Sequence, residues 1–380
     1  MTRIYLIRHA EAEGNLYRRV HGWYDSLITE NGHLQIKALE ERFADVPLDA
    51  VYSSDLFRAK TTANALCAAK GLKLRIRSDL REVNMGEWED NTWAGVNQVH
   101  PELLTLFNHN SSRWQVEGGE TLTQLRDRVS NAILEIAADH DGETVAVVSH
   151  GMAIRNVLAK FLGQPVDETE ILHGDNTCVA LLEIEGERVG IAFHNDNSHL
   201  GELSTFKRQS FWKKGGGALS DASLWFRPLD FQDYGKLYYE ARKEAWSSIH
   251  GSLKGFDGEG FYHDAVAQTD RDARAVMLAM LGDQPAGMIQ LDFWRDVDQK
   301  VGGIPFYYMM PETREKGIGV QLLGEAISLY RKMGREKLRL RCAPDNDRAQ
   351  RFYKRYGFVK IAEEQGSRIP LDVLEKKIGY

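Results

Sequence analysis

The chain has few cysteines, no excess of positive charge and no long apolar run. Its 380 residues include three cysteines, Cys67, Cys178 and Cys342, which lie far apart and form no CxxC pair. This spacing excludes a disulfide framework and a cysteine zinc site, and it is typical of proteins in a reducing compartment. No segment approaches the ~20 apolar residues that a membrane span needs. We therefore expect a cytoplasmic protein with no membrane partner.

The balance of charge excludes another class of partner. The formal net charge is −7, with 48 Lys and Arg against 55 Asp and Glu. Because an acidic chain has no general attraction for polyanions, we expect no nucleic-acid partner. Any phosphate chemistry must then come from a local positive pocket. A chain of 380 residues is also too long for one ordinary core, so the length predicts two domains.

Strand-like and helix-like segments alternate over residues 1–206. Apolar runs at Ile4–Ile7, Ala50–Tyr52 and Thr144–Val148 are typical of buried strands. Helices are expected at 31–44, 58–70, 122–140 and 152–162, and two later strands at 178–183 and 189–194. This alternation predicts an α/β domain with a mainly parallel sheet covered by helices.

The pattern changes at residues 207–223, which include the triple glycine at positions 215–217. Three glycines in a row are unfavourable in any regular element and favour a linker. Beyond it, the sequence predicts helices at 235–249, 319–333 and 348–356, and strands at 275–281, 287–293, 304–310 and 337–342. We therefore divide the chain into a domain at 1–206, a linker at 207–223 and a domain at 224–380.

Charged side chains gather where the predicted strands of the first domain end. Arg8 and His9 follow the first strand, and His150 follows the strand at 144–148. Ligands of open α/β sheets bind at this carboxyl edge. Arginine holds phosphate oxygens by paired hydrogen bonds, and its charge keeps a nearby imidazole neutral and able to attack. Arg58, near a helix start, and Glu82, in a loop, would complete an anion site with a carboxylic acid.

These residues, in this order, resemble the histidine phosphatase superfamily, which includes the cofactor-dependent phosphoglycerate mutases. The resemblance covers about the first 205 residues and rests on five segments, LIRHAEAEGN, VYSSDLFRAKTTA, LREVNMGEWE, GGETLTQLRDRV and VVSHGMAIRNVL. It implies a three-layer α/β/α fold in which His9 becomes phosphorylated. It also implies that Glu82 protonates the leaving oxygen and that the phosphoryl group is held by Arg8, Arg58 and His150.

The same resemblance implies roles for further positions. Asn15 matches a position that contacts the phosphoryl group, and Thr177 matches one near the pocket. Trp88 is expected to favour the protonated form of Glu82 by desolvation. Ala10 stands where the family most often has glycine, which narrows the floor of the pocket slightly.

The remaining histidines of the first domain predict no second site. His194 and His199 are five residues apart, with no carboxylate at suitable spacing, so we interpret them as packing residues and not as metal ligands. His21 and His33 could line the mouth of the pocket, but surface positions are favoured. We expect the first domain to need no metal ion.

The segment between the acid and the second histidine separates two alternatives. The mutases that this domain resembles carry a long insertion there, which helps to retain a bisphosphate. His150 follows Glu82 by 68 residues, which is short for that role. We therefore predict hydrolysis of a small phosphorylated metabolite. Phosphoglycerate mutase and α-ribazole-phosphate phosphatase activities are the alternatives.

The second domain carries a glycine-bearing loop before an amphipathic helix, in the segment IPFYYMMPETREKGIGVQLLGEAI. Gly317 and Gly319 would let the backbone N–H groups of the helix start approach a pyrophosphate closely. Arg314 and Lys316 add positive charge. Alone, this short pattern is also typical of an ordinary loop before a helix.

A later segment, LRLRCAPDNDRAQRFYKRYGF, predicts a strand, a turn and a helix. Together the two segments resemble the GNAT N-acetyltransferase family, over about residues 224–380. The resemblance implies an α+β fold with acetyl-CoA in a V-shaped opening between the strands that end at Met310 and Ala343. It also implies that the loop at 314–319 binds the pyrophosphate, that Asn346 contacts the cofactor and that Tyr353 protonates the departing thiolate.

The base that would deprotonate an acceptor amine is not identified by the sequence. The strand at 306–310 has no carboxylate, so Asp292 and a chain of water molecules are the candidates. Two interpretations of this domain stay open: acetyl transfer to an amine, and the binding and sensing of acyl-CoA without transfer. The whole chain is thus predicted to be bifunctional, with a phosphorylated metabolite, acetyl-CoA and an amine as partners. Homo-oligomerisation stays open.

Overall fold

The computed structural model describes residues 1–109, 111–209 and 222–380. The chain divides into two compact units, Met1–Gly216 and Gly217–Tyr380. The triple glycine of the expected linker lies outside the described residues. Helix α8 (Thr205–Gln209) ends the described part of the first unit, so residues 207–209 are helical and not part of a linker.

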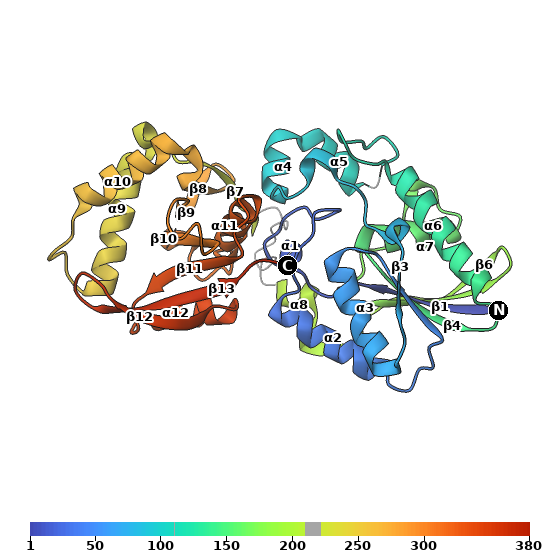
Figure 1. The fold of residues 1–380 in the computed structure, drawn as a ribbon. Helices are drawn as coiled ribbons and strands as arrows, with labels where there is room; N and C mark the ends of the chain where they lie inside the picture. Colours follow the sequence, from blue (N-terminus) through green and yellow to red (C-terminus); the bar gives the residue numbers. More distant parts are fainter. Residues whose placement is uncertain (110, 210–221) are drawn as a thin grey trace. The chain divides into compact units, whose positions relative to one another are not determined.

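The first unit is built on a six-stranded sheet in the order β3-β2-β4-β1-β5-β6 (Figure 1). Its parallel part consists of β1 (Thr2–Arg8), β2 (Ala50–Ser53), β3 (Leu74–Ile76) and β4 (Thr144–Ser149). Antiparallel pairing adds β5 (Val179–Glu185) and β6 (Arg188–Asp196). The predicted, mainly parallel sheet is therefore confirmed.

Helices cover both faces of this sheet because the side chains of its central strands alternate. Ile4 and Leu6 pack with the helices of one face, α4 (Trp93–Val99), α5 (Pro101–Asn108), α6 (Leu122–Asp139) and α7 (Gly151–Phe161). Ile7 packs on the other face with α2 (Glu30–Arg42) and α3 (Phe57–Lys70). The result is the expected three-layer fold. The single turn α1 (Glu13–Leu16) follows β1.

All elements predicted for the first unit are present, with ends shifted by up to two residues. Strand β3 is missed because it has three residues, two of them exposed. Helices α4 and α5 are missed for another reason. They are short, and their place depends on a cluster of aromatic rings contributed by Trp88, Trp93, Phe107 and Trp114.

The second unit is a seven-stranded sheet in the order β12-β13-β11-β10-β9-β8-β7. Its strands are β7 (Trp225–Pro228), β8 (Val276–Leu281), β9 (Gln284–Asp292), β10 (Val301–Met309), β11 (Lys337–Cys342), β12 (Val359–Gln365) and β13 (Pro370–Lys377). Its helices are α9 (Phe231–His250), α10 (Gly258–Arg271), α11 (Val320–Lys332) and α12 (Asp347–Arg355). The sequence analysis did not predict α10, β7, β12 and β13.

Strands β10 and β11 form the parallel pair of this sheet, and their pairing stops early. The register runs from Val301–Lys337 to Ile304–Leu340, although β10 continues to Met309 and β11 to Cys342. Beyond that point Phe306 and Tyr308 pack against α9 and α10, whereas Tyr307 contacts the aromatic rings of α12. The strands thus part where the sequence predicts the V-shaped opening.

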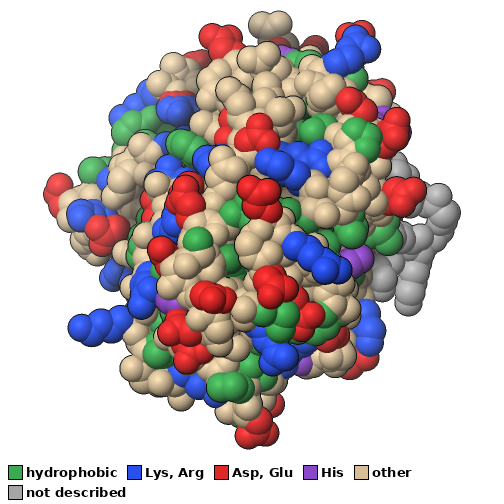
Figure 2. Space-filling view, turned by 90° about the vertical axis from the view of Figure 1, so that its right-hand side faces the viewer, with side chains coloured by type: hydrophobic (Ala, Val, Ile, Leu, Met, Phe, Trp, Pro, Cys, Tyr) green, Lys and Arg blue, Asp and Glu red, His purple; other side chains and the backbone are tan. Residues whose placement is uncertain are grey.

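The surface shows no large area of one charge on the face drawn in Figure 2, where acidic and basic side chains are mixed. None of the described helices is both long and apolar enough to cross a membrane.

Candidate active sites

Two histidines meet where the central strands of the first unit end. Arg8 is the register partner of Ser149, so His9 and His150 both stand one residue beyond this last pair of β1 and β4. Their ring centroids are 5.2 Å apart. His9 is 2% exposed and His150 is fully buried. Because parallel strands end at the same edge of a sheet, two histidines that are 141 positions apart in sequence lie next to each other.

The protonation of His9 is set by its own backbone. Its Nδ1 lies 2.8 Å from the carbonyl oxygen of Ala10. Since a carbonyl only accepts, Nδ1 carries the hydrogen and Nε2 keeps a lone pair. Burial, together with the charges of Arg58 and Arg8, lowers the pKa of His9 well below its usual value. His9 is therefore a neutral imidazole with a nucleophilic Nε2.

Two arginines supply the positive charge of this pocket. Arg58 is fully buried, and its Nη2 donates to the carbonyl oxygens of His21 at 2.8 Å and Gly22 at 2.6 Å. The Nη1 of Arg8 donates to Gly174 O at 2.6 Å, while its Nε is buried without a partner among the described residues. Arg8 makes fewer hydrogen bonds than Arg58, so more of its N–H donors are available to an anion.

A third histidine completes the pocket, which corrects the expectation of a surface position for His21. Its ring lies 5.8 Å from that of His9, and its Nε2 is 3.3 Å from Nδ2 of Asn15. A Cβ at Gly14 would stand 2.3 Å from this ring, so only glycine admits it. Burial and the charge of Arg58 lower the pKa values of both His21 and His150 well below the usual value.

The ring nitrogens of His150 have no hydrogen-bond partner among the described residues, although both are buried. Buried polar atoms are seldom left unpaired, so this ring is poised for a ligand. His33, by contrast, is exposed as expected. In the described part of the chain, no group of three or more His, Cys, Asp or Glu could hold a metal ion.

Asn15 and Thr177 lie beside the pocket, linked by a residue that the sequence analysis missed. Asn176 donates from Nδ2 to the carbonyl oxygen of His9 at 3.0 Å and to Oδ1 of Asn15 at 3.3 Å. Thr177 has φ +55°, which is unusual for a β-branched residue, and its N–H donates to Arg8 O at 3.1 Å. Its hydroxyl lies 3.1 Å from Nε2 of His199, whose Nδ1 lies 3.1 Å from Nη1 of Arg42. Thr177 thus acts on the pocket through its backbone.

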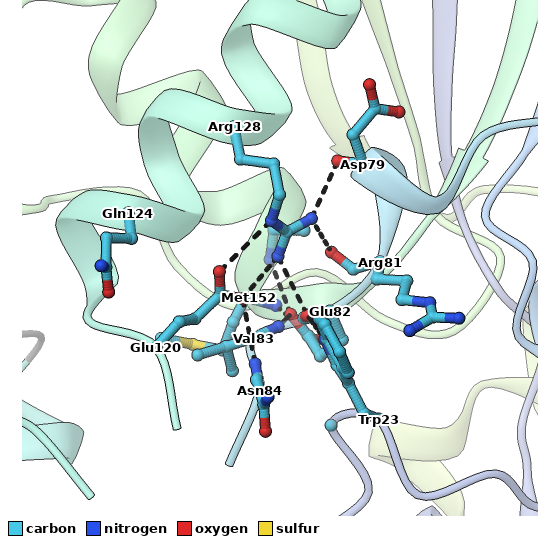
Figure 3. A network of polar contacts seen from close by, with 12 residues as sticks. Trp23, Asp79, Arg81, Glu82, Val83, Asn84, Glu120, Gln124, Arg128 and Met152 are labelled. Atoms are coloured by element: carbon cyan, nitrogen blue, oxygen red, sulfur yellow. Dashed lines mark hydrogen bonds and ion pairs between the residues drawn. The ribbon is translucent and has the colours of Figure 1, made fainter. Parts of the chain in front are cut away.

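Glu82 is held by the start of α7, not by Trp88. Its carboxylate accepts the backbone N–H groups of Met152 and Ala153, both at 2.9 Å (Figure 3). N–H donors at a helix start stabilise negative charge on a carboxylate. The ring of Trp88 packs instead with other aromatic side chains. The N–H groups at the start of α7 are thus the contacts that place this carboxylate, and its desolvation by Trp88 stays a prediction.

Arg128 fixes the segment that carries Glu82, as Figure 3 shows. From α6 its guanidinium donates to three carbonyl oxygens, those of Asp79 at 2.8 Å, Arg81 at 3.1 Å and Glu82 at 3.2 Å. It also forms an ion pair with Glu120. Arg128 is a positioning residue that the sequence analysis overlooked, although it lies in the quoted segment GGETLTQLRDRV.

In the second unit, Tyr353 stands on α12 beside the place where β10 and β11 part. Its ring is 6.1 Å from that of Tyr307 and 8% of the residue is exposed. Its hydroxyl makes no hydrogen bond to any described residue. Burial, with a smaller contribution from Cys342, raises the pKa of Tyr353 above its usual value, so its hydroxyl keeps its proton.

The loop before α11 matches the expected pyrophosphate loop in part. Gly317 has φ +70°, a conformation that favours glycine, and Lys316 is exposed. Gly319 is the N-cap of α11. Arg314 differs from the expectation, because its Nη1 and Nη2 donate to the carboxylate of Glu244 at 3.1 and 2.8 Å. Its charge is already paired and points toward α9.

The side chains of Asn346 and Asp292 both make hydrogen bonds to nearby backbone N–H groups. The side chain of Asn346 accepts the N–H of Ala349 at 3.1 Å, so it caps α12. Asp292, a candidate base, accepts the N–H groups of Trp294 and Arg295 in a turn. Asp292 pairs with Gly303 in the register of β9 and β10, at the opposite end of β10 from Met309. A base role for Asp292 is therefore not supported.

Comparison with known proteins agrees with this division into two units. Residues 4–197 match the family model of the histidine phosphatase superfamily (branch 1), and residues 236–358 match that of the acetyltransferase (GNAT) family. Phosphoserine phosphatase 1 of Hydrogenobacter thermophilus is 30% identical over 203 residues, covering 53% of this chain and 96% of that protein. Phosphoglycerate mutase-like protein 4 of Arabidopsis thaliana is 32% identical over 205 residues, covering 53% and 88%.

A solved structure gives the same result for the fold. Bacillus stearothermophilus YhfR is 31% identical, with a TM-score of 0.51, and the match covers 53% of this chain and all of that one. The pocket of His9 and His150 lies inside the first matched region, and the parting of β10 and β11 lies inside the second. This chain therefore belongs to the histidine phosphatase superfamily and carries a GNAT acetyltransferase domain after its phosphatase domain.

Proposed function

We propose that the first domain hydrolyses a phosphate monoester of a small metabolite through a phosphohistidine at His9. The observation that carries this proposal is the neutral, buried His9 ring with Nε2 free, 5.2 Å from an unpartnered His150. Arg8 and Arg58 would balance the charge that spreads over the phosphoryl oxygens as its bonds loosen. His150 and Asn15 would complete the contacts.

The first step transfers the phosphoryl group to the protein. Nε2 of His9 supplies the electron pair for the new P–N bond, the ester P–O bond breaks, and Glu82 gives its proton to the leaving oxygen. In the second step a water oxygen attacks phosphorus, Glu82 takes the proton of that water, and the P–N bond breaks. Inorganic phosphate leaves, and Nε2 regains its lone pair.

Glu82 serves in both steps, as the proton donor in the first and as the proton acceptor in the second. The backbone N–H groups of Met152 and Ala153 hold its carboxylate in place at the start of α7.

Hydrolysis is favoured over mutase action by the length of chain between the two catalytic groups. His150 follows Glu82 by 68 residues, and these form α4, α5, α6 and β4 with no further domain. Incubation with a phosphoglycerate and with an aryl phosphate tests this. Release of inorganic phosphate from both supports hydrolysis, whereas rapid isomerisation of the phosphoglycerate without phosphate release contradicts it. Phosphoserine is the first metabolite to test, because one of the relatives is named a phosphoserine phosphatase.

We propose that the second domain transfers an acetyl group to an amine. Its family implies the use of an acyl-CoA, and when bound, acetyl-CoA would supply the acetyl thioester. The residues fit such a molecule: Gly317 has φ +70°, Gly319 is the N-cap of α11 and makes no side-chain cap, and Lys316 is exposed. Tyr353 holds a proton at its hydroxyl for a departing thiolate.

Acetyl-CoA binding, measured together with turnover over a panel of amines, separates transfer from sensing. Release of free CoA with an acetylated amine supports transfer. Tight binding of acetyl-CoA with no product from any amine would instead favour the sensor that the sequence leaves open.

A further inference from the structure

Arg242 of α9 is a charged residue of the second domain that has no role in the function proposed above. Its guanidinium carbon lies 4.0 Å from the ring centroid of Phe306 and 4.8 Å from that of Phe261. Both aromatic rings therefore lie close to the guanidinium. Arg242 is only partly exposed, and this burial lowers the pKa of its guanidinium from the usual value.

The partners of this guanidinium are neutral. Its Nε donates to the hydroxyl of Tyr238 at 2.8 Å, and Nη2 donates to Oε1 of Gln290. Gln290 is 2% exposed and is fixed in turn by Gln268, whose Oε1 accepts from its Nε2 at 3.0 Å. The two acceptors are thus rigidly placed, and neither carries a charge.

No carboxylate of the described residues lies within ion-pair distance of Arg242. The nearest acidic influence on it is Asp264 of α10, which acts only through longer-range attraction. An arginine has five N–H donors, of which the described contacts use two. Arg242 is partly buried, and an arginine charge beside apolar rings is more favourable when an anion pairs with it. Arg242 therefore has both the charge and the free donors to bind one.

The location connects this cation with acetyl transfer. Phe306 stands two residues beyond Ile304, the last residue of β10 that pairs with β11. Arg242 lies on the α9 face of β10, whereas Tyr353 contacts Tyr307 on the other face. The guanidinium and the proposed acid thus lie on opposite faces of β10, beyond the point where β10 parts from β11.

We propose that the acetyl acceptor is an amine that also carries an oxyanion, and that Arg242 binds this oxyanion. The proposal rests on the acetyltransferase function proposed above. The planar fork of a guanidinium matches a carboxylate or a phosphate with two parallel hydrogen bonds. Amino acids and aminoalkyl phosphates are the two substrate classes with this chemistry.

Acetylation by the full chain tests the proposal with three arms: free amino acids, aminoalkyl phosphates, and the carboxamides of the same amino acids. We expect wild type to prefer one anionic arm over the carboxamides, and Arg242→Gln to lower kcat/KM for that arm by about 100-fold. Activity with carboxamides should be unchanged. Arg242→Lys keeps the charge and loses the planar fork of donors, so its kcat/KM for the preferred anionic arm should lie between those of wild type and Arg242→Gln. Lys243→Gln, the next residue on α9 with an exposed side chain, is the control.

Wild type that uses neither amino acids nor aminoalkyl phosphates better than the carboxamides would overturn the proposal. An equal loss of activity on all three arms in Arg242→Gln, with acetyl-CoA binding intact, would overturn it as well. If no amine is acetylated, the acetyltransferase function fails. The oxyanion site is then judged by calorimetric titration with the same amino acids and aminoalkyl phosphates in the presence of CoA. Binding that Arg242→Gln abolishes and Lys243→Gln keeps would support the site. Absence of binding in wild type would refute it.

Discussion

Replacement of Arg128 by methionine should slow the hydrolysis of phosphate esters whose leaving group needs a proton, and should affect other esters much less. The guanidinium holds the backbone of the Glu82 segment through the carbonyl oxygens of Asp79, Arg81 and Glu82, at 2.8 to 3.2 Å. Methionine has a similar length and no donor, so these contacts and the ion pair with Glu120 are all lost. The carboxylate of Glu82 then loses the support that aims it at the leaving oxygen.

The magnitude follows from two contributions. A hydrogen bond from a charged donor is worth about 1.5–3 kcal/mol. Because the side chain of Arg128 is 22% exposed and water can replace part of these bonds, we expect the free energy of unfolding to fall by about 2–4 kcal/mol. General acid catalysis contributes roughly 10²- to 10⁴-fold, and a misplaced acid loses part of it. We therefore expect kcat/KM for alkyl phosphates, which reports departure of the leaving group, to fall about 10- to 100-fold.

The assay compares an alkyl phosphate with p-nitrophenyl phosphate. The nitrophenolate leaves without a proton, so kcat/KM for p-nitrophenyl phosphate, which reports the first step alone, should change by less than about threefold. Arg126→Met is the matched control, because Arg126 lies on the same helix and donates to Gln164, away from Glu82. An equal loss on both substrates, or an unchanged rate with the alkyl phosphate in a folded variant, would refute the positioning role.

Three other perturbations have defined outcomes. Gly14→Ala would put a Cβ 2.3 Å from the His21 ring; displacement of that ring should lower kcat/KM about 100-fold, and a rate near that of wild type would contradict the tight packing. Tyr353→Phe should lower the rate of acetyl transfer at least 10-fold with unchanged acetyl-CoA affinity, and an unchanged rate would remove the acid role. Burial lowers the pKa values of His9, His21 and His150 in the folded state, so unfolded chains bind more protons below pH ~6.5 and stability should fall as the pH drops. A melting temperature that stays constant from pH 7 to pH 5 would contradict this.

The sequence could predict the groups that regular elements place. Arg8, His9 and His150 follow directly from the ends of buried strands, since parallel strands present their carboxyl ends at one edge. Their mutual distance needs no long-range information beyond the order of strands. Helix and strand ends in the first domain were accordingly predicted to within two residues.

Groups placed by irregular loops could not be found in this way. His21 enters the pocket because the loop folds back over Gly14 and is tied to Arg58, and these contacts have no sequence period. The signal that existed was Gly14 itself, inside the first motif. Arg314 likewise turned to Glu244, 70 residues away on α9. Pairing between distant elements depends on packing that composition and spacing do not specify.

The identity of the phosphorylated residue tests the central claim most directly. Full-length protein would be mixed with an excess of a turned-over phosphomonoester, quenched in alkali within milliseconds and digested for mass spectrometry. The account predicts an acid-labile, alkali-stable phosphate on Nε2 of His9, absent from His9→Ala, which should also lose phosphate release. Phosphate on another residue, or continued hydrolysis by His9→Ala, would contradict it.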